Sequence, residues 1–421
     1  MDIYIFIILL INPCEINSLR QDGEDQSQEM MDHVQEGTNQ NNTEQVKIRV
    51  DRILKNNPVF DGHNDFPSVL TNHFNLSRLR ENLNSDLILE KGFKRNNKSQ
   101  TDLNRLREGC VGGQVWSAYV PCSAQFNDAV EVGLTQIDTV HRLIEEYPKD
   151  LMLVTSTKSI KEAFNLGKIA SMVGVEGGHA INSNLAVLRS FYRSGVRYLT
   201  LTHHCNTPWI DSSDVELGIF LPEVYGLSEF GEHVILEMNR IGMMIDLSHV
   251  DTAAMRHVLR TTQAPVMFSH SGARAIFDHP RNVPDDVLEL VRDNDGIVMV
   301  VFNSCYLVSR CTDNRGTIKD VVRHIDHVRR TAGVDHVGLG AGFDGVDLVP
   351  VGLEDVSKYP NLLQALIQYS EHHWADEDLM KLARKNFLRV FQSVEIVRDR
   401  MLFKGETADH VEIQDSFYNF K

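Results

Sequence analysis

The sequence predicts an α/β fold of the (β/α)8 TIM-like barrel type. From residue 58 onward, short apolar runs rich in β-branched residues alternate with longer amphipathic stretches, a pattern typical of a parallel sheet covered by helices. There are eight such runs, and eight parallel strands with intervening helices make up this barrel. A doubly wound open sheet is the alternative, because the pattern alone does not show whether the strands close into a ring.

The eight expected strands are Val59–Asp61, Gln114–Val120, Ala170–Val175, Tyr198–Thr202, Met243–Leu247, Pro265–Ser269, Ile297–Phe302 and Val337–Gly340. Between them, apolar residues recur every three or four positions, which predicts helices over Asp128–Tyr147, Leu185–Ser194, Leu227–Ile241, Thr252–Leu259, Pro284–Arg292 and Thr317–Thr331. Ser228 is expected to begin one helix. Pro284 is expected to begin another, because two aspartates follow it and acidic residues are favourable in a first helical turn.

The composition is that of a folded protein with room for a large core. Of its 421 residues, 42% are hydrophobic and 24% are charged, close to the averages of globular domains. The formal net charge of −16 disfavours nucleic acid as a partner, because binding phosphates requires a clustered basic face.

Residues 1–18 are expected to be a signal peptide. The apolar run Ile3–Ile11 has the length of a secretory hydrophobic region and is too short to span a bilayer. Asp2 stands where a basic residue is usual, so a cytosolic chain with an apolar start is the alternative. Three acceptor sequons, at Asn41, Asn75 and Asn97, favour secretion and glycosylation.

Three further segments are expected after the signal peptide. Residues 19–50 should be a disordered polar leader, because they are rich in Gln, Glu, Asp and Asn and offer little apolar surface to bury. Residues 51–400 should form the barrel domain, and residues 401–421 a polar tail. That tail lacks the hydrophobic stretch of roughly 10–20 residues that a lipid-anchor signal requires, and no transmembrane helix is expected.

Six cysteines leave the disulfide pattern open. Cys14 falls in the expected signal peptide, and the other five cannot all pair within one chain: Cys110, Cys122, Cys205, Cys305 and Cys311. Their spacing does not match a zinc ribbon. The sequence is therefore compatible both with disulfides and with cysteines buried as apolar side chains.

Ionisable residues follow six of the eight apolar runs. They occur in Asp61–Asp65, Glu176–His179, His203–His204, Asp246–His249, His270 and Gly342–Asp344. Because the carboxyl ends of barrel strands converge on one face, we expect these side chains to meet there.

His63, Asp65 and Glu176 are candidate metal ligands. His63 and Asp65 are two residues apart, so on an extended chain their side chains leave the same face. A strand-end turn capped by Asp65 would explain that pair equally well. Glu176 directly follows an apolar run, where an unpaired carboxylate is costly to bury, so it needs a cation or strong donors unless a loop exposes it to solvent.

His249 and His270 follow adjacent expected strands, so their imidazoles should meet. One strand-end histidine is more often structural, but two that converge on a carboxylate favour metal binding. With Glu176 as a bridge, His63 and Asp65 would hold one ion and His249 and His270 the other. Nitrogen and oxygen ligands favour two Zn²⁺ ions, with Mn or Co as alternatives, and such a pair activates water for hydrolysis.

At these residues the sequence resembles the membrane (renal) dipeptidase family of zinc metallopeptidases, from about Asn57 to Phe391. Eight blocks in order carry the resemblance: DGHND at 61–65, VGGQVWSAYVPC at 111–122, GVEGGHAI at 174–181, YLTLTHHCNTPW at 198–209, IDLSHV at 245–250, FSHS at 268–271, RNVPDDVL at 281–288 and GLEDVSKYP at 352–360. The resemblance implies a barrel of the metallo-dependent hydrolase type that cleaves dipeptides.

The resemblance also implies roles for individual residues. The metal ligands would be the five chosen above, with Glu176 bridging the ions and taking part in catalysis. His203 would face the scissile carbonyl and its developing negative charge, and Arg281 would bind the substrate carboxylate. A disulfide between Cys122 and Cys205 is implied as well. The partner of Cys311 in the family is replaced by Phe277, and Cys305 is a candidate replacement.

One departure from the family bears on activity. At the eighth strand the family has GDFDG, whereas this chain has Ala341-Gly342-Phe343-Asp344-Gly345. Gly342 therefore replaces a carboxylate that, in the family, orients the attacking water and carries its proton. Asp344 remains, and strand alternation would place it on the same face as position 342.

Three functions follow from the sequence. The first is a secreted zinc-dependent dipeptidase. The second is a catalytically impaired dipeptidase-like binding protein, which the loss of the acid at Gly342 suggests. The third is another metal-dependent hydrolase, such as an esterase, lactonase or β-lactamase, because the barrel alone does not fix the substrate. The sequence is compatible with a homodimer but does not determine the oligomeric state.

Overall fold

The computed structural model describes residues 43–73, 99–313 and 315–411. Of the described residues, those up to Asp51 and those from Arg52 onward belong to separate units, and the barrel lies entirely in the second. The expected signal peptide, most of the leader, the three sequons, Cys14 and the last ten residues of the tail lie outside the described residues.

Eight parallel strands close into a barrel, which confirms the predicted fold class. They follow one another in the order β1, β2, β4, β5, β6, β7, β8 and β9, and β9 pairs with β1 to close the ring. Their bounds are Val59–Asn64, Val111–Tyr119, Ile169–Glu176, Val196–Thr200, Met244–Asp246, Met267–Ser271, Ile297–Val300 and Val337–Leu339. Each matches one of the eight predicted runs.

A short ninth strand, β3 (Leu151–Leu153), was not predicted. It pairs with the first three residues of β4, from Ile169 to Ser171, before β5 takes over as the neighbour of β4 at Val173. Three residues give too short an alternation of apolar and polar side chains to be recognised in a sequence.

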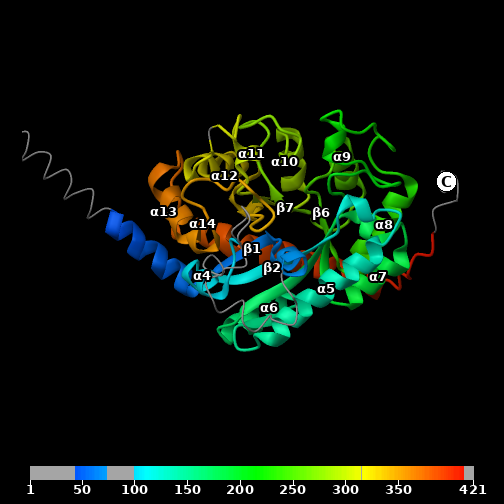
Figure 1. The fold of residues 1–421 in the computed structure, drawn as a ribbon, viewed down its shortest axis with the longest axis horizontal. Helices are drawn as coiled ribbons and strands as arrows, with labels where there is room; N and C mark the ends of the chain where they lie inside the picture. The colour runs from blue at the N-terminus through cyan, green and yellow to red at the C-terminus, as the bar shows by residue number, and fades with distance from the viewer. Residues whose placement is uncertain (1–42, 74–98, 314, 412–421) are drawn as a thin grey trace, which may run out of the picture. The chain divides into compact units, whose positions relative to one another are not determined.

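Helices surround the strands (Figure 1). The six predicted helices are α5 (Ala129–Glu146), α7 (Leu185–Arg193), α8 (Glu229–Ile241), α9 (Thr252–Thr261), α10 (Asp285–Asp293) and α12 (Ile318–Ala332). Ser228 caps α8 by accepting a hydrogen bond from the Gly231 amide, and Pro284 immediately precedes α10, so both predicted starts are confirmed. The remaining helices are α2 (Phe66–His73), α4 (Leu103–Glu108), α6 (Thr157–Asn165), α11 (Ser304–Leu307), α13 (Tyr359–Tyr369), α14 (Asp376–Met380) and α15 (Asn386–Phe403).

Two predicted segment boundaries differ from the structure. Residues 43–50 of the expected leader are helical, because Val46 and Val50 are one helical turn apart and give this stretch a buried apolar face, while Ile48 is exposed. At the other end, α15 continues to Phe403, past the expected domain boundary at residue 400. Met401 belongs to the buried core, which explains why the helix extends that far.

One buried apolar cluster joins α15 to the strands. It contains Phe387, Val390, Phe391 and Val394 of the helix together with side chains from most of the strands. The Phe387 ring stacks on that of Phe60 in β1, with 4.1 Å between the centroids. Tyr198 of β5 belongs to the same cluster, and its hydroxyl lies 2.9 Å from Nδ1 of His63, so the apolar core reaches directly to the predicted site.

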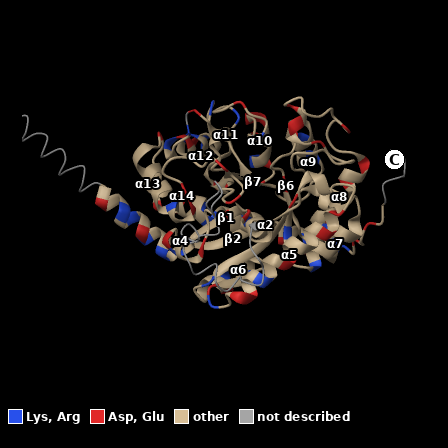
Figure 2. Cartoon of the chain, in the orientation of Figure 1, with Lys and Arg blue, Asp and Glu red and all other residues tan. Residues whose placement is uncertain are grey.

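Acidic and basic side chains are interspersed along the outer helices (Figure 2). Within the described residues, we find no helix that is both long and apolar enough to cross a membrane.

The packing of α15 leads to a stability prediction. Phe387→Ala should destabilise the protein by about 3–5 kcal/mol, because it removes a fully buried aromatic ring and leaves a cavity. Ile396→Ala, on the same helix at a side chain that is 57% exposed, is the matched control and should change the unfolding free energy by less than about 1 kcal/mol. Urea denaturation followed by circular dichroism measures both, and equal effects would contradict the packing role of Phe387.

Candidate active site

The strand ends bring the predicted metal ligands together. His63 lies in β1 with Asp65 just beyond it, Glu176 is the last residue of β4, and His270 lies in β7. His249 follows β6, with a positive φ of 68° that turns the chain sharply after the strand. All five side chains are buried or nearly so.

Glu176 lies at the centre of the group, and its two carboxylate oxygens face different histidines. Oε2 lies 3.5 Å from Nε2 of His63, which in turn lies 3.3 Å from the Asp65 carboxylate. Oε1 lies 3.3 Å from Nε2 of His249 and 3.4 Å from Nε2 of His270. The two oxygens thus face different histidines, although the His270 ring also lies 3.8 Å from that of His63, and the division into two ligand pairs stays a prediction.

The contacts within this group suit metal ions better than hydrogen bonds. Nε2 of His63 is buried and has no hydrogen-bond partner among the described residues. The Nε2 atoms of His249 and His270 face each other at 3.0 Å. The ligand atoms of His63, Glu176 and His270 all lie within 4.8 Å of one another. Imidazole nitrogens and carboxylate oxygens that converge in this way form the donor set that Zn²⁺ prefers.

The pKa shifts of His249 and His270 agree with this chemistry, whereas that of metal-free His63 has the opposite direction. Burial lowers the pKa of His249 and of His270 well below that of free imidazole, and positive neighbours including Arg281 add to the effect. Both rings are therefore neutral near pH 7, the form that binds metals. Burial also disfavours the charged form of His63, but the carboxylates of Asp65 and Glu176 outweigh burial and raise its pKa. Burial raises the pKa of Glu176, and His63 opposes that shift.

His203 and His204 extend the group of imidazoles toward the mouth of the cavity. The His203 ring lies 4.4 Å from that of His249 and 4.8 Å from that of Tyr119. Burial, followed by the charges of His204 and Arg281, lowers the pKa of His203 well below its usual value, so its ring is neutral near pH 7. His204 is half exposed and is paired with Asp214 at 3.1 Å.

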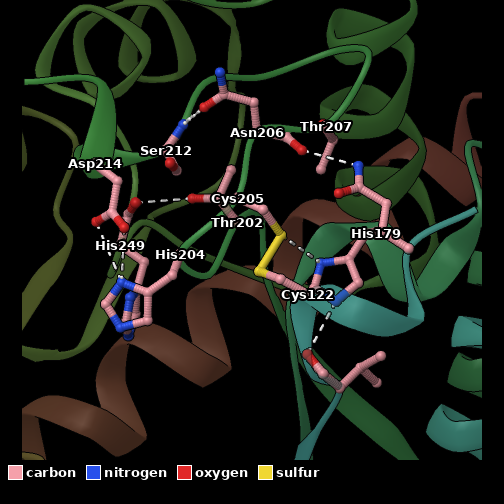
Figure 3. The surroundings of a disulfide bond; sticks show 12 residues. Cys122, His179, Thr202, His204, Cys205, Asn206, Thr207, Ser212, Asp214 and His249 are labelled. Atoms are coloured by element: carbon pink, nitrogen blue, oxygen red, sulfur yellow. Dashed lines mark hydrogen bonds and ion pairs between the residues drawn. A yellow bond between two sulfur atoms is a disulfide. The ribbon is translucent and has the colours of Figure 1, made fainter. Parts of the chain in front are cut away.

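A disulfide joins Cys122 to Cys205, as the family resemblance implied (Figure 3). Cys205 follows His203 and His204 directly, and Cys122 lies just after β2, so the bond ties the loop that carries both histidines to the end of β2, which is separated from β5 by β4. His179 lies behind it, with Nδ1 3.8 Å from the Cys205 sulfur and Nε2 2.9 Å from the Val120 carbonyl oxygen.

A second disulfide joins Cys305 to Cys311. It confirms Cys305 as the replacement partner of Cys311. Cys110 belongs to neither disulfide.

Arg281 is more deeply buried than a substrate-binding arginine in a loop would be expected to be. Its guanidinium donates to the His270 carbonyl oxygen at 3.0 Å and lies 5.1 Å from the centroid of the Tyr306 ring. Tyr306 lines the cavity, whereas Arg281 does not. Nε of Arg281 has no hydrogen-bond partner among the described residues, so one donor remains available. Its role as a carboxylate clamp stays a prediction.

Asp344 and Gly342 face the same cavity, as predicted, but strand alternation is not the reason. β9 ends at Leu339, and both residues lie in the following loop with positive φ, 73° at Gly342 and 67° at Asp344. Both line the cavity, but Oδ1 of Asp344 accepts a hydrogen bond of 2.7 Å from the Gln100 amide. Burial raises the pKa of Asp344 to about 6.

The cavity has a volume of about 260 Å³ and is bounded by the residues described above together with others that sequence analysis missed. These are Tyr119 at the end of β2, Asn303 after β8, Tyr306 on α11, and Ser68 on α2. Tyr119 is the last residue of β2, and Asn303 follows β8; these are the two strands to which the sequence assigned no functional residue. Their position at a strand end was the available signal, but neither residue is ionised at neutral pH, so it was overlooked.

A closed (β/α)8 barrel with imidazoles and carboxylates around a cavity at its strand ends has the architecture of the metal-dependent barrel hydrolases. Residues 47–404 match the family model described as membrane dipeptidase (peptidase family M19). This protein therefore belongs to the membrane dipeptidase family.

Individual relatives agree with this assignment. The chain is 45% identical over 350 residues to Dipeptidase 3 of Mus musculus, a match that covers 83% of this chain and 67% of that protein. Its fold is similar to the crystal structure of dipeptidase AC, a metallopeptidase, with 26% identity, a TM-score of 0.69, and coverage of 80% of this chain and 98% of that one. It is similar to a metallopeptidase from Rhodobacter sphaeroides bound to a phosphinate mimic of L-Ala-D-Ala, with 26% identity, a TM-score of 0.67, and coverage of 80% and 99%.

The central position of Glu176 leads to a prediction about metal content. If Glu176 bridges two ions as predicted, Glu176→Gln should weaken the binding of both by more than the roughly 10–100-fold that loss of an outer partner costs, because the neutral amide would serve neither ion well. Zinc content after dialysis, measured by inductively coupled plasma mass spectrometry, gives the readout. Glu232→Gln alters an acid that pairs with a histidine on the surface and should leave the zinc content unchanged. If Glu176→Gln retained two zinc equivalents, Glu176 would not be the bridging ligand.

Proposed function

We propose that this protein is a zinc-dependent dipeptidase that hydrolyses the peptide bond of dipeptides at a binuclear metal site. The observation that carries the proposal is the two-sided environment of Glu176, whose oxygens face His63 on one side and His249 and His270 on the other. One carboxylate between two sets of ligands is the arrangement expected of a bridge between two ions.

His63 and Asp65 would hold one ion, His249 and His270 the second, and Glu176 both. Two bound zinc ions would polarise the scissile carbonyl and lower the pKa of a water molecule that attacks it. Mn or Co would suit the same nitrogen and oxygen ligands.

The remaining chemistry would come from side chains of the cavity. His203 is neutral and lines the cavity beside His249, so it can donate a hydrogen bond to the carbonyl oxygen as negative charge develops there. The Cys122–Cys205 disulfide would hold its loop in place. Arg281 would bind the substrate carboxylate, if Tyr306 moves or a water molecule bridges the two groups.

The cavity volume of about 260 Å³ favours small substrates. That space is of the size needed for a dipeptide with modest side chains. The similar metallopeptidase from Rhodobacter sphaeroides binds a mimic of L-Ala-D-Ala, which makes L-Ala-D-Ala and L-Ala-L-Ala the first pair of substrates to compare.

We infer that the protein enters the secretory pathway. The inference rests on the apolar run at residues 3–11, the three sequons and the two disulfides, since disulfides persist in oxidising compartments.

The second candidate function is a dipeptidase-like binding protein with impaired catalysis. It is favoured by Gly342, which contributes no carboxylate to the cavity. Asp344 also lines the cavity, but its Oδ1 is engaged by the Gln100 backbone amide and only its Oδ2 has no hydrogen-bond partner among the described residues. Without an acid near the attacking water, substrate would bind but proton transfer would be slow.

Arg281→Lys tests the carboxylate clamp. An ammonium group does not reproduce the planar fork of a guanidinium, so we expect KM for L-Ala-D-Ala to rise about tenfold or more with a smaller change in kcat. Arg274→Lys alters a partly exposed arginine paired with Glu216 and should leave KM unchanged. An unchanged KM in Arg281→Lys would show that Arg281 only supports the loop of His270.

Gly342→Asp tests whether the missing acid limits turnover. A Cβ at this position would have its nearest neighbour, Cγ1 of Val346, at 3.5 Å, so there is room for a side chain. Aspartate tolerates the positive φ better than most residues. We expect kcat to rise by roughly 10²–10⁴-fold with unchanged zinc content.

Gly342→Asn is the matched control, because it has the same shape and backbone strain but no charge. It should show no gain. The impaired-catalysis candidate would be dropped if the natural protein already cleaved dipeptides at ordinary enzyme rates and Gly342→Asp added nothing.

A further inference from the structure

A chain of short hydrogen bonds runs from His270 into the barrel. Nδ1 of His270 lies 2.7 Å from Oγ of Ser269, and that hydroxyl lies 2.6 Å from Oδ2 of Asp246 at the end of β6. The opposite nitrogen of the same imidazole, Nε2, faces Oε1 of Glu176 at 3.4 Å. All three residues of the chain are buried.

The direction of these hydrogen bonds follows from the surroundings of Asp246. Its Oδ1 accepts from the backbone amides of Ser248 and Ser269, at 3.1 and 2.7 Å. Its Oδ2 accepts from the hydroxyls of Thr200 and Ser269, both at 2.6 Å. An ionised carboxylate only accepts hydrogen bonds, so Ser269 must donate its single proton to Asp246.

With its proton committed, Ser269 can only accept from His270. Oγ of Ser248 lies 3.4 Å from Ser269, much farther away than Asp246, and the Tyr198 hydroxyl that also lies near Ser269 carries no negative charge to compete with the carboxylate. Ser248 is itself engaged, because it accepts from the His270 amide at 3.0 Å. The proton of the neutral His270 ring is therefore on Nδ1, and the lone pair of Nε2 points at Glu176.

We propose that Asp246 and Ser269 are positioning residues that fix the tautomer of His270 so that Nε2 is ready to bind metal. This inference rests on the proposed function, because it takes His270 as a metal ligand. Neither residue touches the Glu176 carboxylate, so both act through the imidazole. A hydrogen-bond partner on the far nitrogen of a ligating histidine is a common means of fixing its orientation and basicity.

His63 and His249, the other two candidate histidine ligands, have different contacts at Nδ1. Nδ1 of His63 lies 2.9 Å from the Tyr198 hydroxyl, a group that can donate or accept. Nδ1 of His249 is buried and has no hydrogen-bond partner among the described residues. The contacts of Asp246 therefore specify His270 in particular, so their loss should affect one of the two proposed ions more than the other.

Asp246→Asn provides the sharpest test, because it should reverse the direction of the hydrogen bonds from Asp246 to His270 while keeping the shape of the side chain. The amide oxygen would keep the two backbone donors at the Oδ1 position, which places the NH₂ group at the Oδ2 position. That group donates to Ser269, which must then donate to Nδ1 of His270. The ring proton would move to Nε2, where it faces Glu176 and blocks metal binding.

Two measurements follow the effect. The ¹⁵N chemical shifts of His270 in metal-free protein report the tautomer, with the signal assigned by its absence in His270→Gln. Zinc affinity is measured by competition with a chromophoric chelator. We expect the Nδ1–H form in the natural protein, the Nε2–H form in Asp246→Asn, and one zinc bound roughly 10–100-fold more weakly in the variant.

Ser269→Ala gives an independent variant in case Asp246→Asn does not fold. It leaves Nδ1–H without an acceptor and should also weaken one zinc by at least about tenfold. Ser171→Ala removes a buried hydroxyl of β4 that bonds only the Ile169 carbonyl oxygen and should leave both zinc affinities unchanged.

The outcomes separate this inference from the proposed function. If the natural protein binds two zinc ions and both variants keep the natural tautomer and affinities, the positioning role is wrong and the dipeptidase proposal stands. If the natural protein binds no zinc, the dipeptidase proposal fails, and the tautomer measurement on metal-free protein still decides whether Asp246 and Ser269 set the His270 proton.

Discussion

The structure depends above all on the burial of one carboxylate at the end of a strand. Glu176 lies almost without solvent contact at the end of β4, and among the described residues the hydroxyl that donates to it is that of Ser117, 3.5 Å away. A buried carboxylate with so few donors is costly. Three histidines from three other strands surround it, and their imidazoles together with a cation would offset that cost. The closed barrel makes this possible, because only a ring of strands brings four distant segments to one point.

Two kinds of contact inside the barrel hold the candidate histidine ligands in place. On one side, the apolar cluster of strand residues and α15 reaches Tyr198, whose hydroxyl contacts His63. On the other side, a polar network centred on Asp246 holds Ser269 and through it His270. The ligands are thus oriented by atoms buried in the barrel, which is the condition for a metal site with a defined geometry.

The rim of the cavity is built from loops, and one of these loops departs from the family pattern. The Cys122–Cys205 disulfide fixes the segment that carries His203 and His204, and the His204–Asp214 pair lies at its exposed edge. The loop after β9 is where the chain departs from the family, because Gly342 leaves space at the position of an acid and Asp344 turns to Gln100. The core of the barrel therefore supports metal binding, while the question of turnover rests on this rim.

The sequence by itself determined the fold class, all eight strands of the barrel and the five candidate ligands, because strand periodicity and the position of polar residues after apolar runs are local features of the chain. It missed β3 and the boundaries of the helices at residues 43–50 and 401–403, whose patterns are short or mixed. The tertiary structure alone decided the orientation of His249 and Asp344, since each has a positive φ that alternation along a strand does not anticipate. It also decided the partners of Asp246, the burial of Arg281 behind Tyr306, and the place of Tyr119 and Asn303 at the cavity, because these depend on which strands become neighbours when the ring closes.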